Sequence, residues 1–438
     1  MRNSIVAITV ALGLVPLSAC VWSSGGEDDF PELTPFPPAM EERLHEIRDK
    51  VAEIRGLPIH EEAQEGLLTT KALQEYDRDQ FAALEDEDAE EVEAAESMLV
   101  LLGLVPPGYT FADDYASDSA ELIAGLYYFE ADRLVLIGEA TSELSISDEL
   151  TLAHEYAHSL QDWEFGLDKF LVEWTESQLE EDGYSSYQDT LSCLIEGDAE
   201  LTQRLYAEEV LGPDWLDQLD AESADDEPVD SDLPEFLARS IAFNYGDCVS
   251  FVEALYEDGG WDAVNAAYED PPATQEQVLD PDKYDARELA SGPKPDSLED
   301  ELDGWSEAFE GQFGAFDVFN YVVSRTDDSA AAAAGALGWG SGWIRTYRDD
   351  GDASRIAVDL TFRWDSGVDY LEFLGAFLLV LESYGVSPED IEGEDVFRWT
   401  ALEEYGQHGA LILDEVSTKT RIIFATDEEA LEMFLPAD

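Results

Sequence analysis

The hydrophobic positions near the start of the chain recur at the spacing of an α-helix. Leu44, Ile47, Val51 and Ile54 are three or four residues apart, so a helix would place them on one face. Most of the positions between them are charged or polar, which suits a face turned toward solvent. We therefore predict that residues 40–98 form a helical region whose apolar face packs on the rest of the protein.

The pattern then changes to that of β-strands before it returns to helix. Within Leu122–Glu139, two β-rich runs flank Glu130-Ala131-Asp132, an arrangement typical of a hairpin. The following stretch, 147–165, predicts a helix with Ser147 as its N-cap. A second helix is predicted over 190–210.

The C-terminal half mixes predicted helices and strands. We expect an acidic connector at 217–232, a mainly helical stretch at 234–319 with a loop at 270–281, and a helix end plus turn at 329–342. The remaining predicted elements are a helix at 368–384 and strands at 343–348, 355–364, 410–416 and 420–426. The whole pattern predicts an α+β protein: a mainly helical body with a small β-sheet before the helix at 147–165, and a C-terminal α/β layer.

The first residues are typical of a bacterial export signal. Arg2 gives a positive start, an apolar run covers 5–17, and Leu17-Ser18-Ala19-Cys20 ends it. This tetrapeptide resembles the bacterial lipobox, which implies cleavage before Cys20 and acylation of its thiol. The alternative is a transmembrane anchor, but the run is shorter than the ~20 residues that a span requires and contains Pro16.

Export to the outer side of the cell membrane follows from this reading. Residues 1–20 would be the signal peptide, and 21–39, with four prolines and several glycine, serine and acidic residues, would be a solvated tether. Stable membrane attachment through Cys20 takes more than one acyl chain, because a single chain binds only marginally. An exported compartment also allows Cys193 and Cys248 to pair, and two buried free thiols are the alternative.

The net charge of the chain limits the kinds of molecule that it can bind. The chain has 22 Lys and Arg against 102 Asp and Glu, which gives a formal charge of −80. Nucleic acid is excluded as a partner, because two polyanions repel each other. Self-repulsion of such a surface fades when the Debye length falls to about 3 Å at 1 M salt. A salt-rich environment and an ordinary acidic secreted protein are both compatible with this composition.

The strongest chemical signal is the segment His154-Glu155-Tyr156-Ala157-His158. Residues four apart lie one turn above each other on a helix, so both imidazoles can reach one metal ion at about 2.0–2.1 Å. The offset of Glu155 keeps it off the metal but lets it act as general base toward a water. With only five His in the chain, this pattern arises by chance in roughly one in a hundred such chains. The alternative is a pair of helix-face histidines with solvent or core partners.

A catalytic zinc site needs three protein ligands, so a third must follow downstream. Glu196, in Leu194-Ile195-Glu196-Gly197-Asp198-Ala199-Glu200, lies 38 residues after His158 and has apolar neighbours that indicate burial. On a helix, Glu196 and Glu200 share a face. We expect Glu196 to bind zinc and Glu200 to accept a hydrogen bond from the distal nitrogen of a ligand imidazole. For Glu200 an acidic solvated face is the alternative.

These motifs resemble a group of prokaryotic exported and lipoprotein metallopeptidase-like proteins with the gluzincin pattern. The likeness covers most of the chain from about Ile47 onward and rests on HEYAHSLQDWEF, LIEGDAE, YFEADRLVLIG, GGWDAVNAAYEDPPATQEQVLDPDKY, FGAFDVFNYVV, GWGSGWIRTYR and FRWDS. It implies one zinc ion held by His154, His158 and Glu196, with Glu155 as base. Relatives often have His where this chain has Asp280, so no role is assigned to that position.

No motif identifies the donor that would stabilise the oxyanion of a hydrolytic reaction. The candidates are His408, Tyr206, Tyr245 and Arg204, and His408 is the only histidine after the metal motif. An exposed loop position without catalytic role is the alternative for His408.

The predicted function is that of a lipid-anchored zinc metallopeptidase that hydrolyses a peptide or protein substrate with Glu155 as base. Its core would be 99–325, preceded by 40–98, which is structural or inhibitory, and followed by a C-terminal region at 326–438. If the hairpin at 127–138 presents a free edge beside the cleft, an extended peptide could bind as an added strand.

Two other functions fit the same motifs. One is a surface lipoprotein that retains a zinc site and binds a partner without catalysis. The other is zinc-dependent hydrolysis of a non-peptide amide or ester, because the motif specifies an activated water better than it specifies a substrate.

Overall fold

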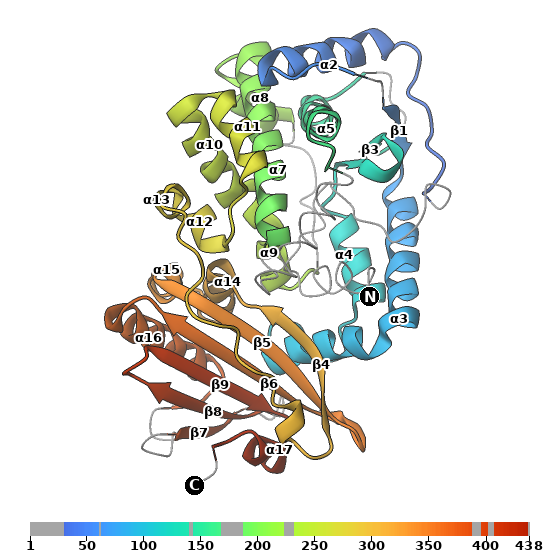
Figure 1. Cartoon of the computed structure of the whole chain (residues 1–438). Helices are drawn as coiled ribbons and strands as arrows, with labels where there is room; N and C mark the ends of the chain where they lie inside the picture. Colours follow the sequence, from blue (N-terminus) through green and yellow to red (C-terminus); the bar gives the residue numbers. More distant parts are fainter. Residues whose placement is uncertain are drawn as a thin grey trace.

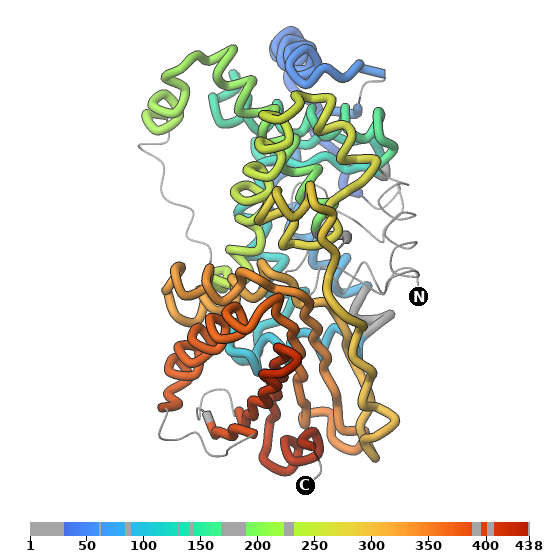
Figure 2. Tube along the Cα trace, turned by 60° about the vertical axis from the view of Figure 1, so that its left-hand side comes forward, coloured from blue at the N-terminus to red at the C-terminus, as the bar shows by residue number. Residues whose placement is uncertain are grey.

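The chain folds into a helical body that contains a three-stranded sheet and, stacked beneath it, a part built on a six-stranded sheet (Figures 1 and 2). The computed structural model describes residues 30–60, 63–139, 143–167, 187–222, 232–387, 396–401 and 407–436. Cys20 with the rest of the export signal, and 223–231 of the predicted acidic connector, lie outside these residues. The α+β class is as predicted. None of the described helices is long and apolar enough to cross a membrane.

The elements of the helical body run in chain order to residue 285. They are α2 (Glu41–Arg55), β1 (Gln64–Leu68), α3 (Thr70–Leu101), η1 (Phe111–Tyr115), α4 (Ala116–Ala120), β2 (Gly125–Tyr128), η2 (Phe129–Ala131), β3 (Arg133–Ile137), α5 (Ile146–Phe165), α7 (Tyr187–Tyr206), η3 (Ala207–Leu211), α8 (Trp215–Glu222), α9 (Glu235–Tyr245), α10 (Asp247–Gly259), α11 (Trp261–Glu269), α12 (Gln275–Leu279) and α13 (Pro281–Asp285). The start of the predicted connector is thus helical, in α8.

The second part begins before the boundary predicted at residue 326. Its elements are η5 (Glu299–Glu301), β4 (Trp305–Gln312), α14 (Ala315–Thr326), α15 (Ser329–Ala336), β5 (Trp339–Asp349), β6 (Asp352–Trp364), α16 (Gly367–Ser383), β7 (Val396–Ala401), β8 (Gln407–Asp414), β9 (Lys419–Ala425) and α17 (Glu428–Met433). The strands pair antiparallel in the order β4-β5-β6-β9-β8-β7.

The four strands predicted for the C-terminal region are confirmed, and two more were missed. One of them, β4, lies in a stretch predicted to be mainly helical, which was wrong at 305–312. Half of its sequence WSEAFEGQ is polar, which suits an edge strand with several half-exposed positions but does not stand out as a strand pattern. Helices α14, α15 and α16 pack on one face of the sheet, where Trp364 stacks on Phe373 with ring centroids 4.3 Å apart.

The predicted hairpin is confirmed as β2 and β3, but it belongs to a larger sheet. The strand β1 pairs in parallel with β3, with Gln64 opposite Arg133, so the order is β1-β3-β2. The prediction that 40–98 is helical was therefore wrong at 64–68. This short strand shows no alternating pattern, and its pairing joins residues that are far apart in the sequence.

The predicted tether is part of the folded body over its last ten residues. Phe30 stacks on Tyr128 with centroids 4.6 Å apart, and the backbone of Thr34 pairs with that of Leu67 in β1. Leu33 is also buried. The prediction of a solvated tether is thus wrong for 30–39, because apolar side chains between the prolines cover the sheet.

The long helix α3 connects the two parts. At 1.5 Å per residue its 32 residues span about 48 Å. Near its start Leu73 and Tyr76 pack on the small sheet, whereas Met98 and Leu102 near its end belong to the core under the six-stranded sheet. The helix therefore braces the helical body against the larger sheet (Figure 1).

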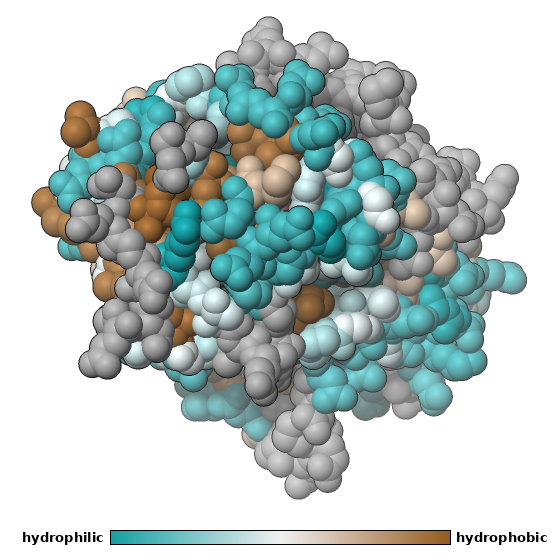
Figure 3. All heavy atoms as spheres, turned by 90° about the horizontal axis from the view of Figure 1, so that it is seen from below, coloured by the Kyte–Doolittle hydropathy of each residue, from teal (hydrophilic) through white to brown (hydrophobic). Residues whose placement is uncertain are grey.

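One side of the larger part exposes apolar side chains. Seen from below, the surface is largely hydrophilic, with hydrophobic side chains gathered on the side where α16 lies (Figure 3). Val368, Leu371 and Leu378 of α16 are 64%, 63% and 43% exposed. Helix α16 is therefore apolar both toward the sheet and toward solvent.

Candidate metal centre

Helix α5 carries the predicted metal motif, and a capping box fixes its start. Ser145 accepts a hydrogen bond from the backbone amide of Asp148, and the Asp148 carboxylate accepts one from the amide of Ser145. The prediction of Ser147 as N-cap was wrong. The reciprocal hydrogen bonds of a capping box need an acidic or amide side chain three residues after the N-cap, and the residue three positions after Ser147 is Leu150.

The structure brings His154, His158 and Glu196 together in the interior. The Nε2 atom of His154 lies 3.0 Å from that of His158 and 3.2 Å from a carboxylate oxygen of Glu196, which is 3.5 Å from Nε2 of His158. All three side chains are buried. Ligand atoms placed tetrahedrally at 2.0–2.1 Å around one zinc ion would be about 3.3 Å apart. The observed separations fit that geometry.

Helix α7 presents Glu196 at a point where it packs closely on α10. Gly197 has no side chain to hold the helices apart, and an added Cβ would lie 2.3 Å from the carbonyl oxygen of Cys248. The same helices are joined by the disulfide between Cys193 and Cys248, with Cα atoms 5.0 Å apart. Of the two alternatives left open by the sequence, the structure thus has the disulfide. The disulfide at Cys193, about one turn before Glu196, and the close packing at Gly197, next to it, together hold this part of α7 in place.

Each ligand imidazole has a polar partner behind it. Glu200, as predicted, lies on the distal side of His154, with its carboxylate 3.6 Å from Nδ1. Behind His158 is Gln161, which the sequence reasoning missed: its Oε1 lies 2.9 Å from Nδ1 of His158, and its Nε2 donates to the carbonyl of Ile195. The signal that could have found it is its position, three residues after His158 on the same helix.

Glu155 is buried beside the ligands and next to the edge of the small sheet. Burial is the largest cause that raises its pKa well above the usual value, and the Glu196 carboxylate acts in the same direction. His154 and the backbone amide of Tyr127 oppose this rise. Gly125 allows the approach of strand and helix, since an added Cβ would lie 3.2 Å from the Cγ of Glu155.

Burial also opposes ionisation of Glu196, but the two imidazoles outweigh it and hold its pKa well below the usual value. One carboxylate oxygen of Glu196, and one of Glu155, is buried without a hydrogen-bond partner in the described part of the chain. Two imidazole nitrogens and a carboxylate form a donor set that suits Zn²⁺. The residues therefore fit the predicted metal.

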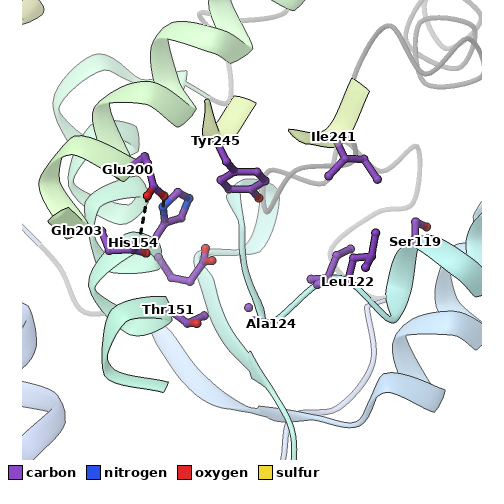
Figure 4. A pocket seen from close by; sticks show the side chains of 12 residues that line it. Ser119, Leu122, Ala124, Thr151, His154, Glu200, Gln203, Ile241 and Tyr245 are labelled. Carbon is purple, nitrogen blue, oxygen red and sulfur yellow. Dashed lines mark hydrogen bonds and ion pairs between the residues drawn. The ribbon is translucent and has the colours of Figure 1, made fainter. Parts of the chain in front are cut away.

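A cleft opens beside His154 and Glu155. Its volume is about 240 Å³, and Tyr245 stands over the site, with its ring centroid 6.0 Å from that of His154 (Figure 4). The lining residues are Ser119, Leu122, Ile123, Ala124, Gly125, Thr151, His154, Glu155, Glu200, Gln203, Ile241 and Tyr245. Of the four candidates for an oxyanion donor, only Tyr245 is among them.

The structure does not bring the other candidates to the cleft. Tyr206 bonds to Glu149, Arg204 pairs with Glu253, and His408 lies on β8, in the six-stranded sheet. Figure 1 shows β8 at the opposite end of the molecule from α5. Catalytic roles for His408, Tyr206 and Arg204 are therefore excluded by their positions, and His408 was the wrong choice in the sequence prediction.

The region at 40–98 holds the ligand helix rather than the cleft. Arg55 of α2 forms a fully buried ion pair with Asp198 of α7 at 2.6 Å, and Asp198 also accepts from the Tyr268 hydroxyl. Trp261 lies under the Arg55 guanidinium, 4.4 Å from it. None of the described residues that line the cleft comes from 40–98. The structure thus favours the structural role over the inhibitory one.

A second cluster of carboxylates is formed by Glu276, Glu288 and Asp365, and the side chain of Lys283 lies among them. The ammonium of Lys283 lies 2.8, 2.7 and 2.9 Å from these three side chains. Burial raises the pKa of Glu276 to about 7, although Lys283 acts against the rise. The group therefore joins α12 and α13 to the turn after β6, and we assign no metal to it.

The chain has no significant match among known proteins. No protein-family model matches the chain, and no curated protein or solved structure matches it significantly. The gluzincin resemblance therefore stays a prediction that rests on the motifs.

Proposed function

We propose that this chain is a zinc-dependent hydrolase of peptide bonds. The observation that carries the proposal is the buried convergence of His154, His158 and Glu196 beside an open cleft, with Glu155 next to them. Bound by those three side chains, zinc would supply a Lewis acid that polarises a carbonyl group and activates water. The attachment of the protein to the cell membrane through lipid on Cys20, outside the cytoplasm, belongs to the same proposal.

Glu155 is the general base. It takes a proton from the attacking water and later delivers a proton to the leaving amine. A carboxylate whose pKa is raised by burial is better matched to this task near neutral pH than an exposed one. Its position on α5, one residue from a ligand, fixes it beside the reacting group without binding the ion.

Tyr245 is the proposed oxyanion donor. It lines the cleft at the C-terminal end of α9, it is 41% exposed, and its ring lies 6.0 Å from that of His154, tilted by 43°. A phenolic hydroxyl can donate to negative charge that develops on a carbonyl oxygen. Replacing Tyr245 by Phe should lower kcat more than it changes KM.

The strand β2 reaches the cleft only at its first residue. Within the described sheet β2 pairs only with β3, and Gly125 lines the cleft. Leu126, Tyr127 and Tyr128 are fully buried, and the amide of Tyr127 is held by Glu155. The predicted addition of an extended peptide as a strand therefore finds no free edge here, and substrate backbone can contact β2 only at Gly125.

The decisive experiment compares metal content and turnover in three proteins purified in molar salt: wild type, Glu155→Gln and Glu164→Gln. Glu164 lies on the same helix but is solvent-exposed, so it controls for loss of one charge on α5. We expect one zinc per chain in all three, with peptide hydrolysis lost only in Glu155→Gln. Undiminished hydrolysis in that variant would refute the assignment of the base.

The binding lipoprotein and the non-peptide hydrolase remain the competing proposals. A folded, zinc-loaded chain that cleaves no peptide of a broad library would favour the binding function. Cleavage of esters or small amides without cleavage of peptides would favour the other hydrolase.

A further inference from the structure

The cleft has two chemically different ends. One end holds His154, Glu155 and Glu200, and the other is formed by apolar side chains from the segment before β2 and from α9. In Figure 4, Leu122 and Ile241 lie on the side away from His154 and Glu200. A group bound at the apolar end would therefore sit beside the reacting bond without touching the metal ligands.

The apolar end is open to contact. Leu122 is 41% exposed, and Ile123 and Ile241 are half-buried, so each side chain keeps apolar surface that a bound molecule can contact. Burying their exposed area under a hydrophobic side chain of a bound molecule would be favourable. A cleft of about 240 Å³ has room for one large side chain and a stretch of extended backbone, and is smaller than the pockets that enclose a whole drug-sized ligand, which start at about 300 Å³.

The apolar end of the cleft offers no cation to an acidic side chain. Neither Lys nor Arg lines the cleft in the described part of the chain, and the proposed zinc ion would lie at the other end, beside His154. An acidic side chain bound at the apolar end would therefore lose its hydration without gaining an ion pair. The net charge of −80 further disfavours acidic substrates at low ionic strength.

From these two features we infer the substrate class: a peptide in which a large aliphatic or aromatic residue adjoins the scissile bond, with acidic residues rejected at that position. The inference rests on the proposed peptidase function. Leu122 and Ile241 are its specificity-determining residues.

The test uses the full zinc-loaded chain in detergent and fluorogenic peptides that differ only at the residues adjoining one bond. We expect kcat/KM to be at least tenfold higher with Leu or Phe than with Asp or Glu. Leu122→Arg should reduce this ratio about tenfold, because it places a cation at the apolar end. Ile241→Arg tests the same end from α9, so that misfolding of one variant does not decide the outcome. Leu289→Arg, at a site 62% exposed and outside the cleft, should leave the ratio unchanged.

The outcomes separate the two proposals. Equal cleavage of Leu and Glu peptides by wild type, or ratios that stay unchanged in both cleft variants, would overturn the substrate class while peptidase activity stands. Absence of cleavage of every peptide by the zinc-loaded wild type would overturn the peptidase function itself.

Discussion

Gln161 allows a sharp test of how the ligand set is held. Its side chain accepts from Nδ1 of His158 and donates to the carbonyl of Ile195, the residue before the ligand Glu196. Zinc needs Nε2 of His158 unprotonated, so the ring must carry its proton on Nδ1, where Gln161 accepts it. Without that acceptor the neutral ring is free to keep its proton on the wrong nitrogen.

The two bonds of Gln161 should appear in different measurements. Loss of the bond to His158 penalises the metal-binding tautomer, so Gln161→Leu should weaken zinc binding about 10- to 100-fold, or about 1.4–2.8 kcal/mol. Loss of the bond to Ile195 removes a buried hydrogen bond with or without metal, although the carbonyl keeps its partner within α7, and this costs about 0.5–1.5 kcal/mol of folding stability. Gln161→Glu keeps the acceptor and loses the donor, so it should reduce stability but retain zinc affinity.

The assay is competition for zinc against a chromophoric chelator, with urea unfolding of the metal-free proteins alongside. Gln218→Leu is the matched control, because Gln218 also donates to a backbone carbonyl, that of Leu211, but at an exposed site. It should change neither zinc affinity nor stability appreciably. Wild-type zinc affinity in Gln161→Leu, or an equal loss in Gln161→Glu, would refute the tautomer argument.

Two further predictions concern packing and pH. Gly197→Ala should destabilise the protein by about 1–3 kcal/mol, because the new methyl group meets the backbone of α10, whereas Gly375→Ala, on the open face of α16, should not; equal urea midpoints for the two would contradict this. Glu276 has a pKa raised to about 7 in the folded protein, so wild type should lose stability as the pH rises from about 4.5 to 7. Glu276→Gln should lack this loss, gaining up to about 3 kcal/mol over wild type between about pH 5 and pH 7.5, and a difference that does not vary with pH would count against it.

The local parts of the site could be predicted from sequence. His154, Glu155 and His158 lie within five residues of one helix, so their relative placement follows from helical geometry alone. Glu196 could be added as the third ligand because a catalytic zinc site needs three protein ligands, and Glu200 follows it one helical turn later. The helix α5 and the hairpin of β2 and β3 were predictable for the same reason, since both are set by short-range patterns.

The missed features all depend on contacts between distant residues. The strand β1 is defined by its partner β3 rather than by its own composition, and the segment at 30–39 is ordered by the sheet that it covers. His408 was attractive because histidines are rare in this chain, yet rarity carries no information about position. Tyr245 could be ranked above the other oxyanion candidates only once α9 was placed beside α5.

The disulfide between α7 and α10 also determines what a cut in the chain would do. Its two cysteines are 55 positions apart in the sequence, and a peptide bond broken anywhere between Cys193 and Cys248 leaves both pieces attached to each other. After a cut between α7 and α10, the first piece, with α7 and its ligand Glu196, would stay packed against α10 on the second piece. A preparation that gives two bands on a reducing gel can therefore still consist of molecules whose metal ligands are all in place. Because the protein is proposed to cleave peptides, self-cleavage that separates the pieces should be measured on a non-reducing gel.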